Sequence, residues 1–437
     1  MKRKKASPSS VSRRDFLKTS SAVVAGGILV GGFPSIVRAQ TPELTKDPIR
    51  LALIGCGGRG TGAANQAMNT GVDVRLVAMA DAFPDRLAKS LETLSGAHPS
   101  QVDVPEERRF VGFDGYKEAI ALADVVILTT PPGFRPLHFE AAVEAGKHVF
   151  MEKPVAVDAP GIRKVLEAAA KAKEKGLKVG VGFQRRHQDG YVETVKRIHD
   201  GAIGETVSSR CYWNSGGVWV KPRQPEWTEL EYQMRNWYYF NWLCGDHIVE
   251  QHVHNIDVIN WVKGAFPIRA QGQGGRQIRT GIDHGQIFDH HFVEFEYADG
   301  TRLYSQCRHQ PGWNNVSEFV QGTRGKASLA GYEIEGEELW KYSGDNPNPY
   351  QIEHDVLFDA IRNNKVHDET DYGIKSTMCG ILGRMCTYSN QMISWDDALA
   401  STVDLAPDVL SWESVPPVLP DADGRYPIPE PGKIDVL

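Results

Sequence analysis

A glycine-rich turn is the first feature of this sequence that could do chemistry. Gly55, Gly57 and Gly60 form a GxGxxG pattern directly after the short apolar run 49–54. Glycines at this spacing permit a tight turn, let backbone approach a pyrophosphate, and let the following helix pack close to the strand. Because a helix N-terminus binds phosphate groups, the turn predicts a dinucleotide site that also includes Gly58 and Arg59.

Two further apolar runs extend this site. The run 75–80 ends at Asp81, whose carboxylate can bind both ribose hydroxyls and would repel a 2′-phosphate, so it favours NAD over NADP. Arg59 and Arg86 are close enough in sequence to weaken that preference. The run 123–130 ends at Thr130 and Pro131, where strand ends form the binding crevice. We therefore predict a Rossmann domain that binds NAD.

The segment 244–257 predicts a helix that displays polar side chains. Gly245 and Asp246 are typical of a helix start, and on a continuous helix Glu250, His254 and Asp257 would share one face. A histidine with a pKa near its usual value of about 6.5 suits a general base. The spacing of Glu250 and His254 also fits two metal ligands, but no third ligand is evident, so we predict no metal site.

The strings Ala145–Val149 (AGKHV) and Glu152-Lys153-Pro154 resemble a mark of the glucose-fructose oxidoreductase, inositol dehydrogenase and rhizopine-catabolism family (Gfo/Idh/MocA). The resemblance implies an α/β fold: an N-terminal Rossmann domain and a C-terminal α/β domain with a large open mixed or antiparallel sheet. It also implies an NAD(P)-dependent oxidoreductase that transfers hydride to or from a hydroxyl of a sugar or polyol.

The same resemblance assigns roles within the site. Lys153 would face the nicotinamide and stabilise a developing alkoxide or relay a proton, and His254 would be the base. Glu250 stands where inositol dehydrogenases carry aspartate, and would orient His254 or bind a substrate hydroxyl. Glu152 would contact a ribose or serve the structure. Two alternatives stay open: an enzyme that cleaves glycosides through transient oxidation, and a sugar-binding protein with structural NAD.

An aromatic-rich stretch from Tyr212 to Trp242 fits a sugar pocket, although for any single aromatic residue ordinary packing is the better interpretation. The predicted substrate contacts are Arg186, Arg235, Trp237 and Asp257.

The first forty residues predict export. Ser12 to Lys18 (SRRDFLK) match a twin-arginine signal, and Val37-Arg38-Ala39 is similar to a cleavage site. We expect a signal peptide over 1–39, a Rossmann domain over 40–185 and a substrate domain over 186–437. The twin-arginine machinery would deliver the folded chain to the periplasm or another extracytoplasmic space, with its cofactor tightly bound; an uncleaved N-terminal anchor is the alternative.

Composition limits the remaining partners. The chain has 437 residues, a net charge of −6 and no basic stripe beyond its N-terminus, so nucleic acid is not an expected partner. Its six cysteines lack CxxC spacing. Ten tryptophans, together with a strand-like run 292–297 whose open face is expected to carry Val293, predict a homodimer or homotetramer through the second sheet.

Overall fold

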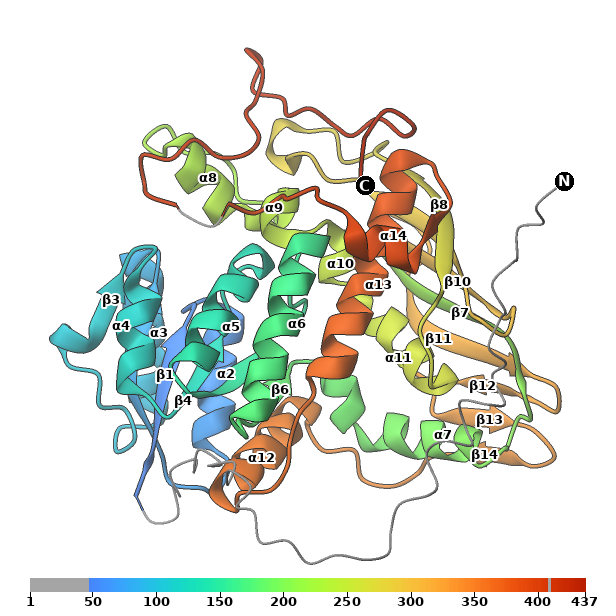
Figure 1. Ribbon diagram of the computed structural model, residues 1–437, viewed down its shortest axis with the longest axis horizontal. Coiled ribbons are helices and arrows are strands. Elements are labelled where there is room, and N and C mark those ends of the chain that lie inside the picture. The colour runs from blue at the N-terminus through green and yellow to red at the C-terminus, as the bar shows by residue number, and fades with distance from the viewer. Residues whose placement is uncertain (1–46, 408–409) are drawn as a thin grey trace, which may run out of the picture. The chain divides into compact units, whose positions relative to one another are not determined.

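A parallel six-stranded sheet forms the first half of the protein in this computed structural model, which describes residues 47–407 and 410–437. The strand order is β3-β2-β1-β4-β5-β6 (Figure 1). The strands are β1 (Ile49–Ile54), β2 (Val74–Asp81), β3 (Arg109–Val111), β4 (Val125–Leu128), β5 (His148–Met151) and β6 (Val179–Val181). The order reverses between β1 and β4, and a ligand crevice opens at the carboxyl ends of strands where an α/β sheet reverses.

Helices cover both faces of this sheet, which explains why its central strands are continuous apolar runs. The helices are α2 (Gly58–Met68), α3 (Pro84–Ala97), α4 (Gly115–Leu122), α5 (Arg135–Glu144) and α6 (Ala159–Glu174). One helix comes from much later in the chain: α12 (Pro349–Arg362) buries Leu357, Phe358 and Ile361 against the core that contains Ile49 and Leu51. The second half of the chain thus completes the core of the first.

A mixed nine-stranded sheet forms the second half, in the order β14-β13-β12-β11-β7-β10-β9-β8-β15. The strands are β7 (Thr206–Ser215), β8 (Arg269–Gly275), β9 (His290–Glu296), β10 (Arg302–His309), β11 (Asn315–Gly322), β12 (Lys326–Ser328), β13 (Glu333–Glu335), β14 (Leu339–Lys341) and β15 (Ile393–Ser394). Only β7 and β10 pair in parallel. The predicted α/β fold with a large open mixed sheet is confirmed.

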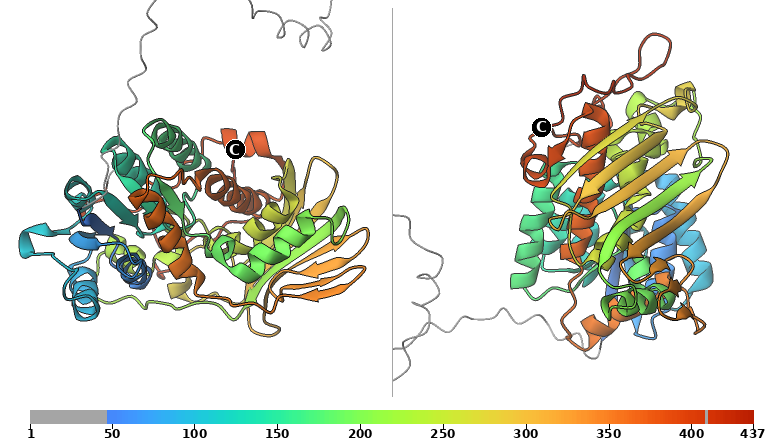
Figure 2. Two further views of the ribbon diagram at one scale, coloured as in Figure 1. Left: turned by 90° about the horizontal axis from the view of Figure 1, so that it is seen from below. Right: turned by 90° about the vertical axis from the view of Figure 1, so that its right-hand side faces the viewer.

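Helices pack on one face of this sheet. Buried side chains of α11 (Val253–Lys263) and α13 (Thr370–Ser389) share a core with Val293 and Phe295 of β9. In the right-hand view of Figure 2 the strands face the viewer and the helices lie behind them. The expectation that Val293 lies on the open face was wrong: Val293 is fully buried, and its neighbour Phe292 is 38% exposed.

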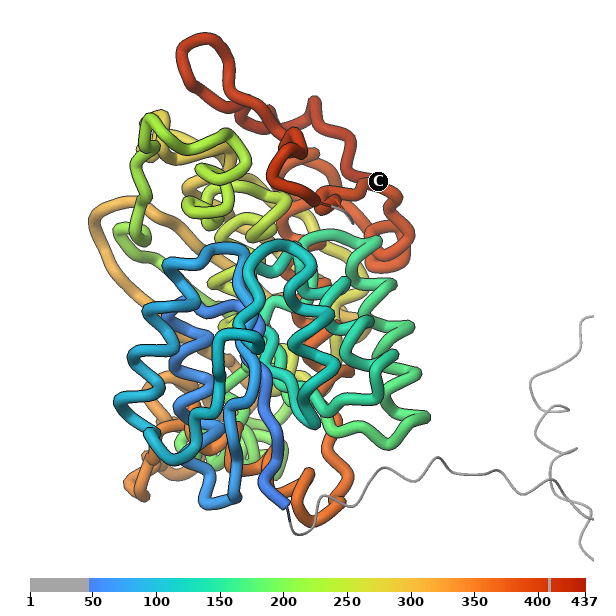
Figure 3. Tube along the Cα trace, turned by 90° about the vertical axis from the view of Figure 1, so that its left-hand side faces the viewer, coloured from blue at the N-terminus to red at the C-terminus, as the bar shows by residue number. Residues whose placement is uncertain are grey.

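The C-terminal segment after α14 (Trp395–Ala400) runs back across the molecule, as Figure 3 shows in dark red. Its Tyr426 packs edge-on against Phe240, and the Gln233 side chain donates a hydrogen bond to the Val418 carbonyl. This segment therefore covers α8 (Glu229–Arg235) and α9 (Asn241–Cys244). Residues 1–46, which include the predicted signal and cleavage site, lie outside the described residues. In the described ranges, no helix combines the length and apolar character needed to cross a bilayer.

One local expectation is corrected. The segment 244–257 does not form one helix: α10 (His247–Glu250) ends before α11, and Gln251 and His252 form a turn between them. The shared polar face predicted for Glu250, His254 and Asp257 therefore does not exist as one helical stripe.

Candidate active site

The glycine turn leaves space for a phosphate. A Cβ atom added at Gly60 would lie 1.9 Å from the Gly55 carbonyl oxygen, and Gly55 has a φ of +95°, so both positions require glycine. Gly57 and Gly58 have no neighbouring atom within 4 Å of such a Cβ, and they begin α2. Open space at a helix N-terminus fits a pyrophosphate.

Asp81 lies at the end of β2, where two backbone amides fix its carboxylate. Cys56 N–H donates to Oδ2 at 2.6 Å and Phe83 N–H donates to Oδ1 at 2.9 Å. Burial raises the pKa of Asp81 from its usual value, and these two hydrogen bonds oppose the rise. A carboxylate has about four acceptor positions, so two remain for ribose hydroxyls. Thr130, followed by Pro131, closes the crevice after β4; its hydroxyl lies 3.1 Å from His138 Nδ1.

Arg59 and Glu152 pair with each other through Nε and Oε1. Arg59 also reaches Glu353 Oε1 of α12 at 3.3 Å and lies over the ring of Tyr350. Burial and the nearby Glu152 hold the pKa of Glu353 well above its usual range. Through Arg59 these contacts join Glu152 and α12 to the glycine turn, which fits a structural role, and a ribose contact of Glu152 stays a prediction.

Lys153 follows β5 and reaches across to α10. Its Nζ donates to the Glu250 carbonyl oxygen at 2.6 Å and lies 3.4 Å from the Glu250 carboxylate. The two side chains are only 12% and 16% exposed. A lysine from the Rossmann half and a glutamate from the second half thus meet at one place, as the sequence predicted for two active-site residues.

His254 begins α11 beside this pair. It is 6% exposed, its ring stacks on Trp213 with centroids 6.1 Å apart, and Nδ1 has no hydrogen-bond partner. Burial, followed by the charges of Lys153 and Arg185, holds the pKa of His254 well below its usual value. The imidazole is therefore neutral at neutral pH. Its lowered pKa makes it a weaker base than the ordinary histidine that the sequence predicted. No hydrogen bond joins it to Glu250 among the described residues.

Two buried ion pairs hold α11 in place. Asp257 accepts two hydrogen bonds from Arg186, at 2.8 and 2.9 Å, and a third from Ser376. Both predicted substrate contacts, Arg186 and Asp257, are thus occupied by each other. On the other side, Glu318 pairs with Arg185 and accepts from the side chain of Asn255 at 2.6 Å.

Arg185, Trp213 and Phe183 are neighbours of His254 that were not among the predicted site residues. Arg185 stands beside Arg186 in the sequence, and Trp213 lies in the aromatic-rich stretch, so the signal existed for both. Residue type and spacing do not show which of two adjacent arginines points toward the histidine.

The other two predicted substrate contacts lie elsewhere. Arg235 pairs with Asp85 of α3 at 3.2 Å and with Glu231, and it lies over the ring of Phe83. Trp237 packs against Trp219 and Tyr238. Among the contacts of the described residues, neither reaches Lys153 or His254. Their assignment to substrate stays a prediction.

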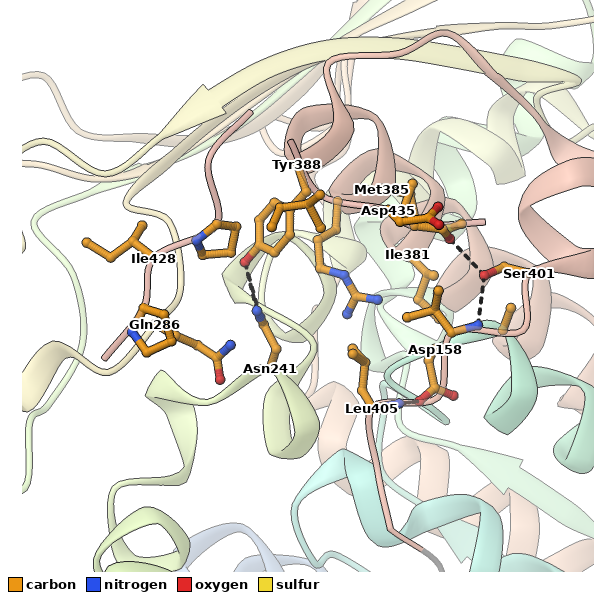
Figure 4. Close-up of a pocket in the computed structure, with 17 residues that line it drawn as sticks. Asp158, Asn241, Gln286, Ile381, Met385, Tyr388, Ser401, Leu405, Ile428 and Asp435 are labelled. Carbon is orange, nitrogen blue, oxygen red and sulfur yellow. Dashed lines mark hydrogen bonds between the residues drawn. The ribbon is translucent and has the colours of Figure 1, made fainter. Parts of the chain in front are cut away.

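A cavity of about 250 Å³ opens beneath the C-terminal segment (Figure 4). Its walls include Asn241 and Tyr388, whose side chains are hydrogen-bonded to each other, with Asp158 and Ser401 on another side. None of the predicted site residues lines it. The cavity is therefore separate from the Lys153–Glu250 pair.

Comparison with known proteins decides the family. Residues 49–183 match the model of the oxidoreductase family with an NAD-binding Rossmann fold (GFO/IDH/MocA). An inositol 2-dehydrogenase of Pseudomonas fluorescens is 30% identical over 288 residues, which cover 64% of this chain and 74% of that protein. The chain belongs to this family. The predictions of an NAD-dependent oxidoreductase and of NAD as cofactor are confirmed.

Other relatives support the same assignment. An inositol 2-dehydrogenase of Rhizobium meliloti is 28% identical over 279 residues, which cover 63% of this chain and 74% of that protein. Among solved structures, a scyllo-inositol dehydrogenase from Lactobacillus casei with bound NAD(H) and scyllo-inositol superimposes with a TM-score of 0.61 at 20% identity, covering 80% of this chain and all of that one. At that identity the likeness shows the fold.

Proposed function

We propose that this protein oxidises or reduces one hydroxyl group of a sugar or polyol, with NAD tightly bound. The observation that carries the proposal is the meeting of Lys153, Glu250 and His254 at the junction of the two sheets. Inositol dehydrogenases among the relatives support a polyol as the substrate class.

The chain's own residues would supply the proton chemistry, while bound NAD supplies the hydride acceptor. The neutral imidazole of His254 would accept the hydroxyl proton as hydride leaves the same carbon. The ammonium group of Lys153 would stabilise the developing alkoxide, and the Glu250 carbonyl and carboxylate fix its position. The burial of His254 and the low exposure of Lys153 and Glu250 strengthen these charge interactions.

A substrate panel tests the proposal. Purified protein would be mixed with inositols, aldoses and glycosides while absorbance near 340 nm and product mass are followed. We expect a bound-nicotinamide signal with one class of polyol or sugar, and a product that differs from the substrate by two hydrogens. A product of glycosidic cleavage would instead favour transient oxidation, and ligand binding without any absorbance change would favour a non-catalytic role.

We also propose that the chain is exported folded by the twin-arginine route to an extracytoplasmic space. The SRRDFLK motif at Ser12–Lys18 supports this, and a trapped cofactor would suit a compartment with little free dinucleotide. Replacing Arg13 and Arg14 together by lysine should leave the protein in the cytoplasmic fraction. Continued export of that double variant would contradict the proposal.

The open face of the nine-stranded sheet supports a homodimer or homotetramer. Phe292 and Tyr304 are each 38% exposed on this face, and Trp313, 59% exposed, packs edge-on against Tyr212 beside them. Exposed aromatic groups of this size are uncommon on a monomer. Light scattering should give a multiple of the chain mass, and Tyr304→Glu should reduce it. A monomer at every concentration would exclude the assembly.

A further inference from the structure

Three buried side chains form a cluster that the proposed reaction does not use. Asp246 precedes α10, His247 begins it, and His291 lies on β9. Their exposed fractions are 0%, 0% and 3%. One potential ligand atom from each lies within 4.8 Å of the other two.

The hydrogen bonds of Thr387 favour one tautomer of the His291 imidazole. The hydroxyl of Thr387 donates to the Arg384 carbonyl at 3.0 Å, so its single hydrogen is used. Thr387 Oγ1 also lies 2.9 Å from His291 Nδ1, where it must therefore accept a hydrogen bond from Nδ1–H. In a neutral imidazole Nε2 then carries only a lone pair.

Among the described residues, no hydrogen-bond donor faces the lone pair of His291 Nε2. His291 Nε2 is buried without a hydrogen-bond partner, and the nearest charged atom is Asp246 Oδ1 at 3.3 Å. Two atoms that can both accept a hydrogen bond thus lie together in a dry interior, and either a proton on Nε2 or a cation beside both atoms would stabilise them. A separation of about 3.3 Å is also what two ligands about 2.0–2.1 Å from a tetrahedral ion would show.

His247 lies against the same carboxylate. Its Nδ1 is 2.8 Å from Asp246 Oδ1, which is a hydrogen-bond distance and about 0.5 Å shorter than the separation of two ligands of a tetrahedral ion. Its Nε2 is buried without a hydrogen-bond partner. The second oxygen of Asp246 accepts from the Tyr388 hydroxyl at 2.5 Å and from Phe288 N–H at 3.0 Å. Such outer hydrogen bonds orient the ligands of metal sites.

The backbone at the cluster is unusual as well. Asp246 has a φ of +74°, a conformation that non-glycine residues rarely adopt. Strain of this kind is retained where surrounding structure requires one particular side-chain position. Here it turns the Asp246 carboxylate toward the two histidines.

We propose that Asp246, His247 and His291 bind a divalent transition metal ion, with Zn²⁺ the best match to two imidazoles and one carboxylate. The ion would tie β9 to the start of α10, and α10 ends at Glu250, which holds Lys153. Tyr388 also lines the cavity of Figure 4, so that cavity ends one hydrogen bond away from Asp246.

Metal analysis of the purified protein tests the site without any need for turnover. We expect about one zinc ion per chain in the unmodified protein, since three protein ligands in a buried site bind the ion tightly. His291→Ala should lose at least nine-tenths of it. The matched control is His290→Ala, because His290 is the adjacent residue on β9 with a side chain that is 39% exposed, and it should retain the metal. Equal zinc in His291→Ala would mean adventitious metal only and would overturn the proposal.

A second measurement covers the case in which His291→Ala does not fold. The unmodified protein would be stripped with a chelator and then titrated with Co²⁺, whose visible absorption reports tetrahedral nitrogen and oxygen ligands. We expect absorption bands to appear at one equivalent, and Zn²⁺ to remove them and raise the melting temperature by several degrees. Stripped protein that shows neither bands nor a melting shift would rule the metal site out.

Discussion

The two sides of the candidate active site differ in the groups that form them. The glycine turn before α2 consists of backbone atoms and empty space, since Gly57 and Gly58 have no neighbour within 4 Å of a would-be Cβ. The segment of α10 and α11 consists of buried charges, such as the pairs of Arg185 with Glu318 and of Arg186 with Asp257. The first side should therefore be sensitive to atoms that are added, and the second to charges that are removed.

The largest expected effect concerns the charged side. Lys153→Ala and His254→Ala should each lower kcat by about 10²–10⁴-fold, the usual range for loss of a general acid or base. Both variants should keep bound NAD, because the glycine turn is unchanged. Glu250→Gln should be milder, since the Glu250 carbonyl still holds the lysine at 2.6 Å.

Lys147→Ala is the matched control for Lys153→Ala. Lys147 precedes β5 and Lys153 follows it, so the two lysines occupy opposite ends of one strand. The control should turn over at the unmodified rate. Unmodified rates in Lys153→Ala and His254→Ala, with nucleotide quantified by mass spectrometry after release, would show that the chemistry lies elsewhere.

A second prediction separates charge from shape. Glu318→Gln keeps the size of the side chain but leaves Arg185 without its partner in a site where Glu318 is fully buried. Removing one member of a buried pair costs about 3–5 kcal/mol. Urea denaturation should show a loss of that order in the free energy of unfolding.

The control is an exposed pair on the same sheet. Lys326 and Glu335 lie 2.9 Å apart with side chains more than half exposed. Glu335→Gln should change the free energy of unfolding by less than about 1 kcal/mol, because exposed pairs contribute little. Equal effects of the two substitutions would remove the contrast between the buried and the exposed pair.

The sequence predicted almost all of the glycine turn before α2, but only part of the charged segment of α10 and α11. Strands β1, β2 and β4 are apolar apart from Arg50, Arg75 and the terminal Asp81, and the turn residues follow them directly, so local patterns predict both strands and site. The break between α10 and α11 depends on Gly245 and Asp246, which both adopt positive φ, and nothing in the apolar spacing signals it.

The ion-pair partners of the charged residues could not be predicted from the sequence for a different reason. Arg185 and Glu318 are 133 positions apart, and Arg186 and Asp257 are 71 apart, so only the folded topology brings them together. A polar residue that satisfies a buried partner and one that awaits a substrate look alike in sequence. For the same reason Arg186 and Asp257 were assigned to substrate although they bind each other.

A third prediction concerns acid stability. Burial, with the charge of Lys178, lowers the pKa of His148 from 6.5 to about 4, and burial with Arg135 lowers that of His138 to about 3. Below pH 6.5 the unfolded chain takes up protons that the folded protein does not, so the free energy of unfolding falls as pH falls. Each histidine should contribute a loss of about 2 kcal/mol between pH 7 and pH 5.

Urea denaturation at the two pH values measures this loss. His148→Asn keeps an acceptor for the Lys178 N–H but cannot take a proton, so it should reduce the pH dependence. His199→Asn, at an exposed position on α7 (Asp189–His199), should leave it unchanged. A free energy of unfolding that stays constant from pH 7 to pH 5 would contradict the burial argument.

The smallest expected change in stability belongs to the glycine side. Gly57→Ala adds one methyl group to open space on an extended backbone, with φ of −72°, so it should change the free energy of unfolding by less than about 1 kcal/mol. Gly60→Ala adds the same group 1.9 Å from the Gly55 carbonyl oxygen and should cost about 1–3 kcal/mol, as overpacking does.

If the space at Gly57 exists for a pyrophosphate, the Gly57→Ala protein should nevertheless carry at least about tenfold less NAD through purification, a difference of about 1.4 kcal/mol in binding. Paired urea denaturation and mass spectrometry of released nucleotide would measure both quantities on one sample. Gly57→Ala protein with undiminished NAD would show that the cofactor's phosphates do not lie in the open space at Gly57. It would contradict the expectation that the glycine turn is sensitive to added atoms.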